Sequence, residues 1–132
     1  AFMDTLYYVW KGGRVPAVAH LATSLLRIKP LLQMSRGKVR NIARPRTSSK
    51  AEDQMLKRMR LCTGTNPIHV VVMHGDVEEQ AEKLKCRVDA EFLCEELYVS
   101  EFSPTMAAHT GPGLLGVAFW TNNKRPGYYR QP

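Results

Sequence analysis

The sequence predicts an α+β domain of two layers, in which a mixed or largely antiparallel sheet carries helices on one face. Short apolar runs of strand length lie at 68–73, 97–102 and 114–120. An amphipathic segment of helix length precedes the first run, and another separates the first from the second. The chain has 132 residues and is 44% hydrophobic, which is enough to bury one core, so we expect one domain.

The first third of the chain is expected to hold two helices and a hairpin. A short helix over 4–11 should end at the glycine pair 12–13. Pro16 suits the first turn of a second, largely buried helix. The runs 30–34 and 39–43 flank a connection that contains a glycine, which predicts an antiparallel hairpin. The apolar face of the second helix would comprise Val18, Leu21, Ala22, Leu25 and Leu26.

The next helix is predicted to begin at Ser49 and to end at Gly64. Ser49 and Glu52 have the spacing of a capping box. The run 68–73 that follows is β-branched and has the pattern of a buried strand. The buried side of the helix should comprise Ala51, Met55, Met59 and Cys62.

Asp76 and Glu79 repeat the capping spacing at the start of another amphipathic helix. After it we expect a strand at 97–102, a short helical turn at 104–108 and a closing strand at 114–120. Residues 122–132 read as a polar tail, so the folded domain is expected to span residues 1–121. The apolar stripe of the helix should comprise Val77, Ala81, Leu84, Val88 and Phe92.

Charge and cysteine content limit the kinds of partner and metal site that this protein can have. The formal net charge is +7, and much of the excess lies between Arg27 and Arg60. Such a face attracts nucleic acid, an anionic membrane, a phosphorylated ligand or an acidic protein, and the charge alone does not choose among them. The three cysteines lack the number and spacing of a disulfide framework or a zinc site, so we expect a reducing cytoplasm and neither metal nor cofactor. No apolar run approaches the ~20 residues that cross a bilayer.

The segment His109-Thr110-Gly111-Pro112-Gly113 is the most informative in the chain. It places an imidazole and a hydroxyl on a glycine-rich turn just before an apolar run. Glycine permits φ > 0 and close backbone approach, and proline fixes φ. The imidazole, the hydroxyl and the amides of such a turn can converge on an oxygen-bearing anionic group. A structural connection that uses its glycines only for geometry is the alternative interpretation.

Three segments carry a family resemblance when they are taken together. They are Asp4-Thr5-Leu6-Tyr7-Tyr8-Val9-Trp10-Lys11-Gly12-Gly13-Arg14-Val15, Ser24-Leu25-Leu26-Arg27-Ile28-Lys29-Pro30 and His109-Thr110-Gly111-Pro112-Gly113-Leu114-Leu115-Gly116-Val117-Ala118-Phe119. In this order and spacing they resemble the C-terminal domain of the DegV family, which are bacterial fatty-acid-binding proteins. The resemblance implies that an N-terminal α/β domain is absent from this chain.

The resemblance also implies a ligand, which is a long-chain fatty acid. His109 would donate a hydrogen bond to its carboxylate, with Thr110 and Gly111 beside it, and hydroxyl groups of the absent domain would complete the site. The acyl chain needs an apolar path, because burial stabilises it by ~0.8 kcal/mol per methylene. Candidate lining residues are Leu21, Leu25, Leu26, Ile28 and Met106.

Some members of the family hand the fatty acid to a kinase that forms an acyl phosphate. The resemblance implies that Arg14 contacts the phosphate or the kinase, since a guanidinium suits both carboxylate and phosphate. Arg44 is a second candidate, although Pro45 departs from the family pattern. Any catalysis would then belong to the kinase, and this chain would be a binding protein and not an enzyme.

Two other functions stay open at this stage. The basic hairpin predicts, as the alternative, a nucleic-acid-binding or protein-docking module, although few aromatic residues and no recognised motif accompany the charge. An enzyme that uses His109 as a general base is the third hypothesis. The sequence shows neither paired carboxylates nor a nucleophile motif to support it.

Overall fold

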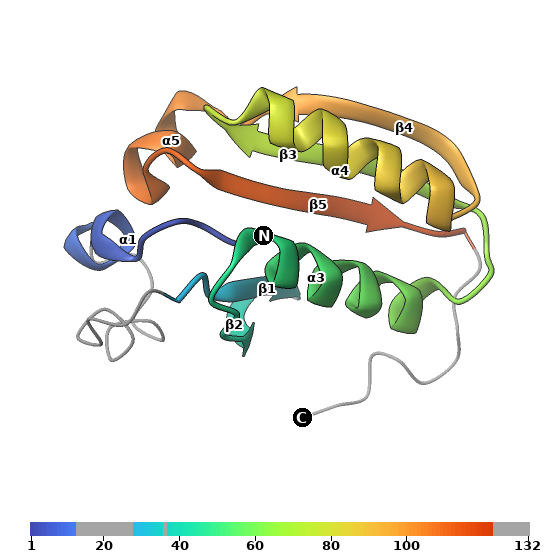
Figure 1. Ribbon diagram of the computed structural model, residues 1–132, viewed down its shortest axis with the longest axis horizontal. Coiled ribbons are helices and arrows are strands. Elements are labelled where there is room, and N and C mark those ends of the chain that lie inside the picture. The colour runs from blue at the N-terminus through green and yellow to red at the C-terminus, as the bar shows by residue number, and fades with distance from the viewer. Residues whose placement is uncertain (13–27, 36, 123–132) are drawn as a thin grey trace.

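The computed structural model describes residues 1–12, 28–35 and 37–122 (Figure 1). The helix predicted to open at Pro16 and nearly all of the predicted tail lie outside these residues. The elements are α1 (Tyr7–Lys11), β1 (Leu31–Ser35), β2 (Lys38–Ala43), α3 (Ser48–Thr63), β3 (Ile68–Gly75), α4 (Glu78–Glu91), β4 (Cys94–Glu101), α5 (Pro104–Thr110) and β5 (Leu114–Trp120).

The strands form a three-stranded sheet and a two-stranded hairpin. The sheet has the order β4-β3-β5, in which β3 pairs parallel with β4 and antiparallel with β5. The hairpin pairs β1 with β2 antiparallel, and its turn contains Gly37 at φ +72°. The predicted hairpin and the predicted mixed sheet are therefore both confirmed.

The N-terminal residues join the hairpin to the sheet. The amide of Phe2 donates to the carbonyl of Leu115 at 2.8 Å, and the amide of Leu115 donates back at 2.9 Å. On the other side, the amide of Leu32 donates to the carbonyl of Ala1 at 2.8 Å. The Phe2 side chain is only 1% exposed, so this short segment fills the gap between β5 and β1.

Helices α3 and α4 cover one face of this assembly, which confirms the predicted α+β layering (Figure 1). Alternate residues of β3 point toward the helices, because successive side chains of a strand point to opposite faces. The core between the layers contains residues that are almost completely buried. From the helices and β3 these are Ala51, Met55, Leu56, Met59, Ile68, Val70, Val72, Ala81, Leu84 and Val88.

Both predicted helix starts are wrong in detail. The side chain of Thr47, not Ser49, caps α3 and accepts from the amide of Lys50 at 3.3 Å. Glu52 instead accepts from Arg87 of α4 at 3.0 Å, which explains its position on the helix. At α4 the capping position is Val77, without a side-chain hydrogen bond, and Asp76 adopts φ +61°. Ser49 lies two positions after the true cap and Asp76 one position before it, and each has a glutamate three residues later, which misled the sequence prediction.

A second, smaller cluster lies with α1. It comprises the buried residues Met3, Leu6, Val9 and Leu114, with Ile28, Leu32 and Phe102 packed against it. Helix α1 also contacts α5, so the first helix and the helix that carries His109 lie at the same end of the molecule (Figure 1). This packing places the start of the chain beside the glycine-rich turn.

Candidate functional site

The His109 side chain lies in the last turn of α5. The helix begins at Pro104, after Ser103, whose side chain accepts from the amide of Met106 at 3.4 Å. It ends at Gly111, and a basic residue in a last turn suits the partial negative charge of a helix C-terminus. The predicted turn at 104–108 is therefore a helix that extends to Thr110. The His109 side chain is half-buried and forms no hydrogen bond with another described residue.

The polar backbone of the turn is largely used within the protein. The amide of Gly111 donates to the carbonyl of Ala107 at 2.8 Å, and the amide of Gly113 donates to the carbonyl of Gly75 at 2.9 Å. The Thr110 hydroxyl donates to the carbonyl of Met106 at 2.8 Å. The Gly111 and Gly113 amides and the Thr110 hydroxyl are therefore already bonded within the protein, whereas the His109 imidazole can still donate to a ligand.

Both glycines of the turn are required by geometry. Gly111 has φ +73° and Gly113 has φ +85°, which L side chains rarely adopt. The ring of Tyr8 occupies the space where a Cβ atom on Gly111 would lie. The Asp4 carboxylate does the same for Gly113, with Oδ2 at 2.6 Å from that position. The turn is therefore packed tightly against the segment that leads into α1.

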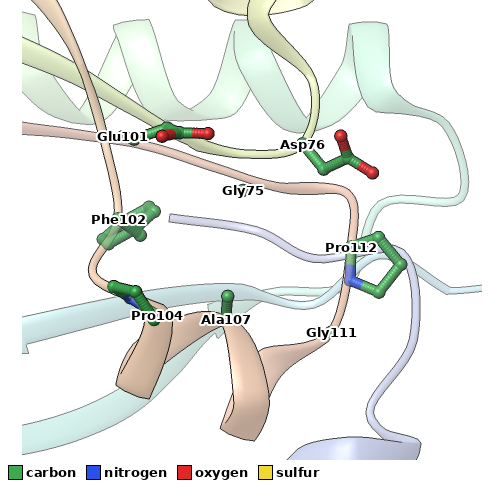
Figure 2. A pocket seen from close by; sticks show the side chains of 8 residues that line it. All are labelled: Gly75, Asp76, Glu101, Phe102, Pro104, Ala107, Gly111 and Pro112. Carbon is green, nitrogen blue, oxygen red and sulfur yellow. The ribbon is translucent and has the colours of Figure 1, made fainter.

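A cavity of about 520 Å³ opens beside the turn, at the ends of β3 and β4 (Figure 2). Ligands of α/β sheets commonly bind outside the carboxyl ends of parallel strands. Asp76 and Glu101 contribute carboxylates, which disfavour an anionic group there. The cavity is lined by Gly75, Asp76, Glu101, Phe102, Pro104, Ala107, Gly111 and Pro112. His109 is not among these residues, so its imidazole and the cavity lie on different parts of the turn.

The predicted lining and phosphate residues are only partly described. Ile28 is half-buried and packs against the second cluster, and Met106 is 40% exposed on α5. Arg44 is exposed between β2 and α3. The remaining candidates, Arg14, Leu21, Leu25 and Leu26, lie outside the described residues.

The remaining described histidines have structural surroundings. The ring of His69 contacts Glu96 through Nδ1 and Glu95 through Nε2, each at 2.8 Å, and stacks on Trp120. His74 is 5% exposed, and its Nδ1 atom has no hydrogen-bond partner. Within the described ranges, no three side chains of the metal-binding kinds are grouped to hold an ion, and no helix is long and apolar enough to span a membrane. Cys62, Cys86 and Cys94 are free thiols.

Sequence reasoning missed the contributions of Asp4, Tyr8, Asp76 and Glu101. In the structure Asp4 pairs with Lys29, and the Thr5 hydroxyl accepts from the amide of Tyr7 at 3.1 Å. The available signal for the two cavity carboxylates was their position just after or at the end of strands. No local pattern indicated that α1 packs on a turn a hundred residues away.

The chain is similar to proteins of one family. Over residues 1–122 it matches the family model described as "Uncharacterised protein, DegV family". A DegV domain-containing protein of Streptomyces coelicolor is 38% identical over 117 residues, which are 88% of this chain and 42% of that protein. The chain therefore spans less than half the length of this relative.

Solved structures agree with the family match. A DegV family protein from Thermus thermophilus, described by its fatty-acid binding, superposes with a TM-score of 0.82 at 30% identity, over 91% of this chain and 44% of that one. DegV from Bacillus subtilis, described as a fatty-acid-binding protein, gives a TM-score of 0.74 at 28% identity, over 89% and 42%. The expected fold and the resemblance are confirmed, and the chain belongs to the DegV family.

Proposed function

We propose that this chain is the part of a fatty-acid-binding protein that contributes His109 to the carboxylate site. The observation that carries the proposal is the joint match to the Thermus thermophilus and Bacillus subtilis proteins, both described by fatty-acid binding. The geometry of the turn supports it, because the imidazole is half-buried and forms no hydrogen bond within the described part of the chain. A partly desolvated N–H donor suits a single carboxylate oxygen.

The rest of the carboxylate site belongs, in this proposal, to the remainder of a longer protein. Residues 1–121 form its C-terminal lipid-binding domain, and an N-terminal domain supplies hydroxyl donors. Thr110 and Gly111 stay predicted contacts, although in the described state their hydroxyl and amide donate to Met106 and Ala107. A ligand that recruited them would have to replace those bonds, so His109 carries most of the interaction.

The acyl chain is expected to extend from the carboxylate at His109 along an apolar surface. Each buried methylene contributes ~0.8 kcal/mol before the ordering of the chain is subtracted. Ile28 and Met106 are the described candidates, and Leu21, Leu25 and Leu26 complete the predicted path. The acidic cavity does not suit the carboxylate end of the ligand, because Asp76 and Glu101 would repel it.

The proposal also includes a kinase as a partner protein. The carrier would present the carboxylate to a kinase, which transfers the phosphoryl group to form the acyl phosphate. Arg14 and Arg44 are the proposed contacts for the phosphate or the kinase, and Arg44 is exposed as that role requires. The chain itself then binds and orients the fatty acid but does not catalyse the transfer.

Mass spectrometry of lipid extracted from the purified protein tests the carboxylate site. The whole protein that contains this chain should retain long-chain fatty acid, and His109→Ala should lower the amount retained. His69→Gln is the matched control. His69 is the second residue of β3, and its ring contacts Glu95 and Glu96 instead of the glycine-rich turn. A wild-type protein that carries no fatty acid and does not respond to added oleate contradicts the proposal.

The alternative use of the basic hairpin is not favoured. Its exposed side chains include Lys38 and Arg40 together with Met34, which is 73% exposed. In the described part of the hairpin no aromatic residue stands beside these cations to stack on a base. The relatives are described by fatty-acid binding, which this surface does not explain.

A further inference from the structure

We propose that Tyr8 and Asp4 are positioning residues for the His109 site. Neither residue needs to touch the ligand. Their side chains fill the space above Gly111 and Gly113 and hold the turn that follows His109 in one conformation. The expected effect on lipid binding rests on the proposed function. The effect of Tyr8 and Asp4 on the position of His109 does not, and it can be tested without a ligand.

Tyr8 controls the first glycine of the turn. Three atoms of its ring crowd the position of a Cβ atom on Gly111, and the ring also packs edge-on against Tyr7, with 5.4 Å between the ring centroids. The neighbouring Tyr7 lies under the ammonium group of Lys11 at 5.7 Å. Tyr8 is 40% exposed, so it contributes little to the main core. The clearest role of its ring is to cover Gly111.

The Asp4 side chain packs against the second glycine of the turn, Gly113. Its carboxyl group lies against Gly113 and forms an ion pair with Lys29. Lys29 is itself fixed, because its amide donates to the carbonyl of Pro45 at 2.7 Å. Lys29 therefore holds the Asp4 carboxylate in place while it contacts Gly113, and the carboxylate limits the movement of that residue.

These contacts bear on His109 because α5 is a short helix. It has seven residues, and the bonds that fix its C-terminal end are the Gly111 amide to Ala107 and the Gly113 amide to Gly75. The Gly113 amide follows Gly111 in the chain, so its bond to Gly75 depends on the positive φ of Gly111, which the Tyr8 ring encloses. If the turn relaxes, the last helical turn, which carries His109, loses its anchor. A hydrogen bond weakens steeply as its distance and angle depart from the ideal, so a shift of the imidazole would weaken its bond to a carboxylate.

The first experiment uses the ligand-free protein. We would record ring signals of ¹³C-labelled histidine by NMR in the whole protein that contains this chain, and assign the His109 signal by its loss in His109→Ala. Tyr8→Ala and Asp4→Ala should shift this signal and speed the hydrogen exchange of the Gly113 amide. Tyr8→Phe keeps the ring, so it should leave the signal near its wild-type position.

The second experiment measures palmitate affinity. Tyr8→Ala is expected to weaken palmitate binding about tenfold, as an incomplete displacement of His109 would, while Tyr8→Phe stays within about twofold of wild type. Gly111→Ala should also weaken binding, because its Cβ atom meets the Tyr8 ring. The double variant Gly111→Ala/Tyr8→Ala should lose less affinity than the two single losses together, because removing the ring relieves the crowding at Gly111 although the backbone cost of its positive φ remains.

Two results would overturn the inference. One is a His109 signal that stays unchanged in both alanine variants. The other is a loss of affinity that matches the unfolded fraction measured by circular dichroism and disappears on cooling, since the residues would then only stabilise the fold. If wild-type protein fails to bind palmitate, the proposed function is wrong, and the ligand-free His109 signal still decides whether Tyr8 and Asp4 position the ring.

Discussion

The ring of Tyr8 lies over Gly111, closer to the position of a Cβ atom at that residue than real Cβ atoms come to other heavy atoms. Gly111→Ala should therefore introduce two costs. Gly111 has φ +73° and ψ 178°, a region essentially restricted to glycine, where an L residue costs about 1–3 kcal/mol. Crowding against a packed ring adds about 1–3 kcal/mol. We expect the free energy of unfolding, measured by urea denaturation, to fall by about 2–6 kcal/mol.

Gly37→Ala is the matched control for this prediction. Gly37 has nearly the same φ, +72°, but no heavy atom lies within 4 Å of its Cβ position. The control should lose only the backbone term, about 1 kcal/mol. Equal losses at the two glycines would show that Tyr8 moves aside freely, which would contradict both the crowding and the positioning role.

The order of elements could be predicted because each carries its own local pattern. Strand β5 runs from Leu114 to Trp120, as predicted, since a continuous apolar run of that length is bounded by Gly113. Strand β3 extends two residues beyond its prediction, to Gly75, because His74 is buried although its side chain is polar. Periodicity identifies apolar faces, but it does not identify buried polar residues.

Helix α3 offers a direct test of the corrected cap. Thr47→Ala should lower the free energy of unfolding by about 1 kcal/mol, because the Thr47 side chain accepts from the amide of Lys50. Ser49→Ala, at the predicted cap, should be neutral or slightly stabilising, because residue 49 lies inside the helix and alanine favours helix. Thermal unfolding of both variants gives the comparison, and the reverse order of effects would restore Ser49 as the cap.

The candidate site was less predictable than the fold. The sequence indicated that Gly111 and Gly113 permit positive φ angles, and both residues adopt them. The partners of these glycines were not, because Asp4 and Tyr8 belong to another segment and reach the turn only through tertiary packing. A sequence shows which residues permit a tight turn, whereas the identity of the group that fills the space depends on long-range contacts.

Arg87 joins the two covering helices and should contribute to stability. Its guanidinium donates to Asp53 at 2.7 Å and to Glu52 at 3.0 Å. The hydrogen bond to Asp53 is the main reason that the pKa of Arg87 is raised above its usual value. Arg87→Gln should lower the free energy of unfolding by about 1 kcal/mol, and the loss should shrink in 1 M salt.

Lys83→Gln serves as the control for Arg87. Lys83 pairs with Glu79 one turn away on α4, and both side chains are exposed, so this pair should contribute almost nothing measurable. If both substitutions have the same small effect in urea denaturation, then the ion pairs of Arg87 with α3 are as weak as an ordinary surface pair, and apolar packing and the Arg60–Glu91 pair join the two helices.

The free thiols should differ in reactivity, and this difference reports on the α4–β4 connection. Burial raises the pKa of the Cys94 thiol, and the nearby charge of Asp89 raises it further. The thiolate is the reactive form, so Cys94 should react with iodoacetamide more slowly than the exposed Cys86 and should gain rate as the pH rises above its usual thiol range. Mass spectrometry of the labelled peptides separates the two sites.

Asp89→Asn distinguishes the two causes of the Cys94 shift. Removal of the carboxylate charge should lower the pKa of Cys94 and speed its labelling at a fixed pH, while the labelling rate of Cys86 serves as an internal reference. Because burial is the larger cause, the acceleration should be partial, and Cys94 should stay the slower site. A Cys94 that labels as fast as Cys86 in the wild-type protein would mean that the start of β4 opens in solution, and that the parallel pairing of Cys94 with Ile68 is not maintained.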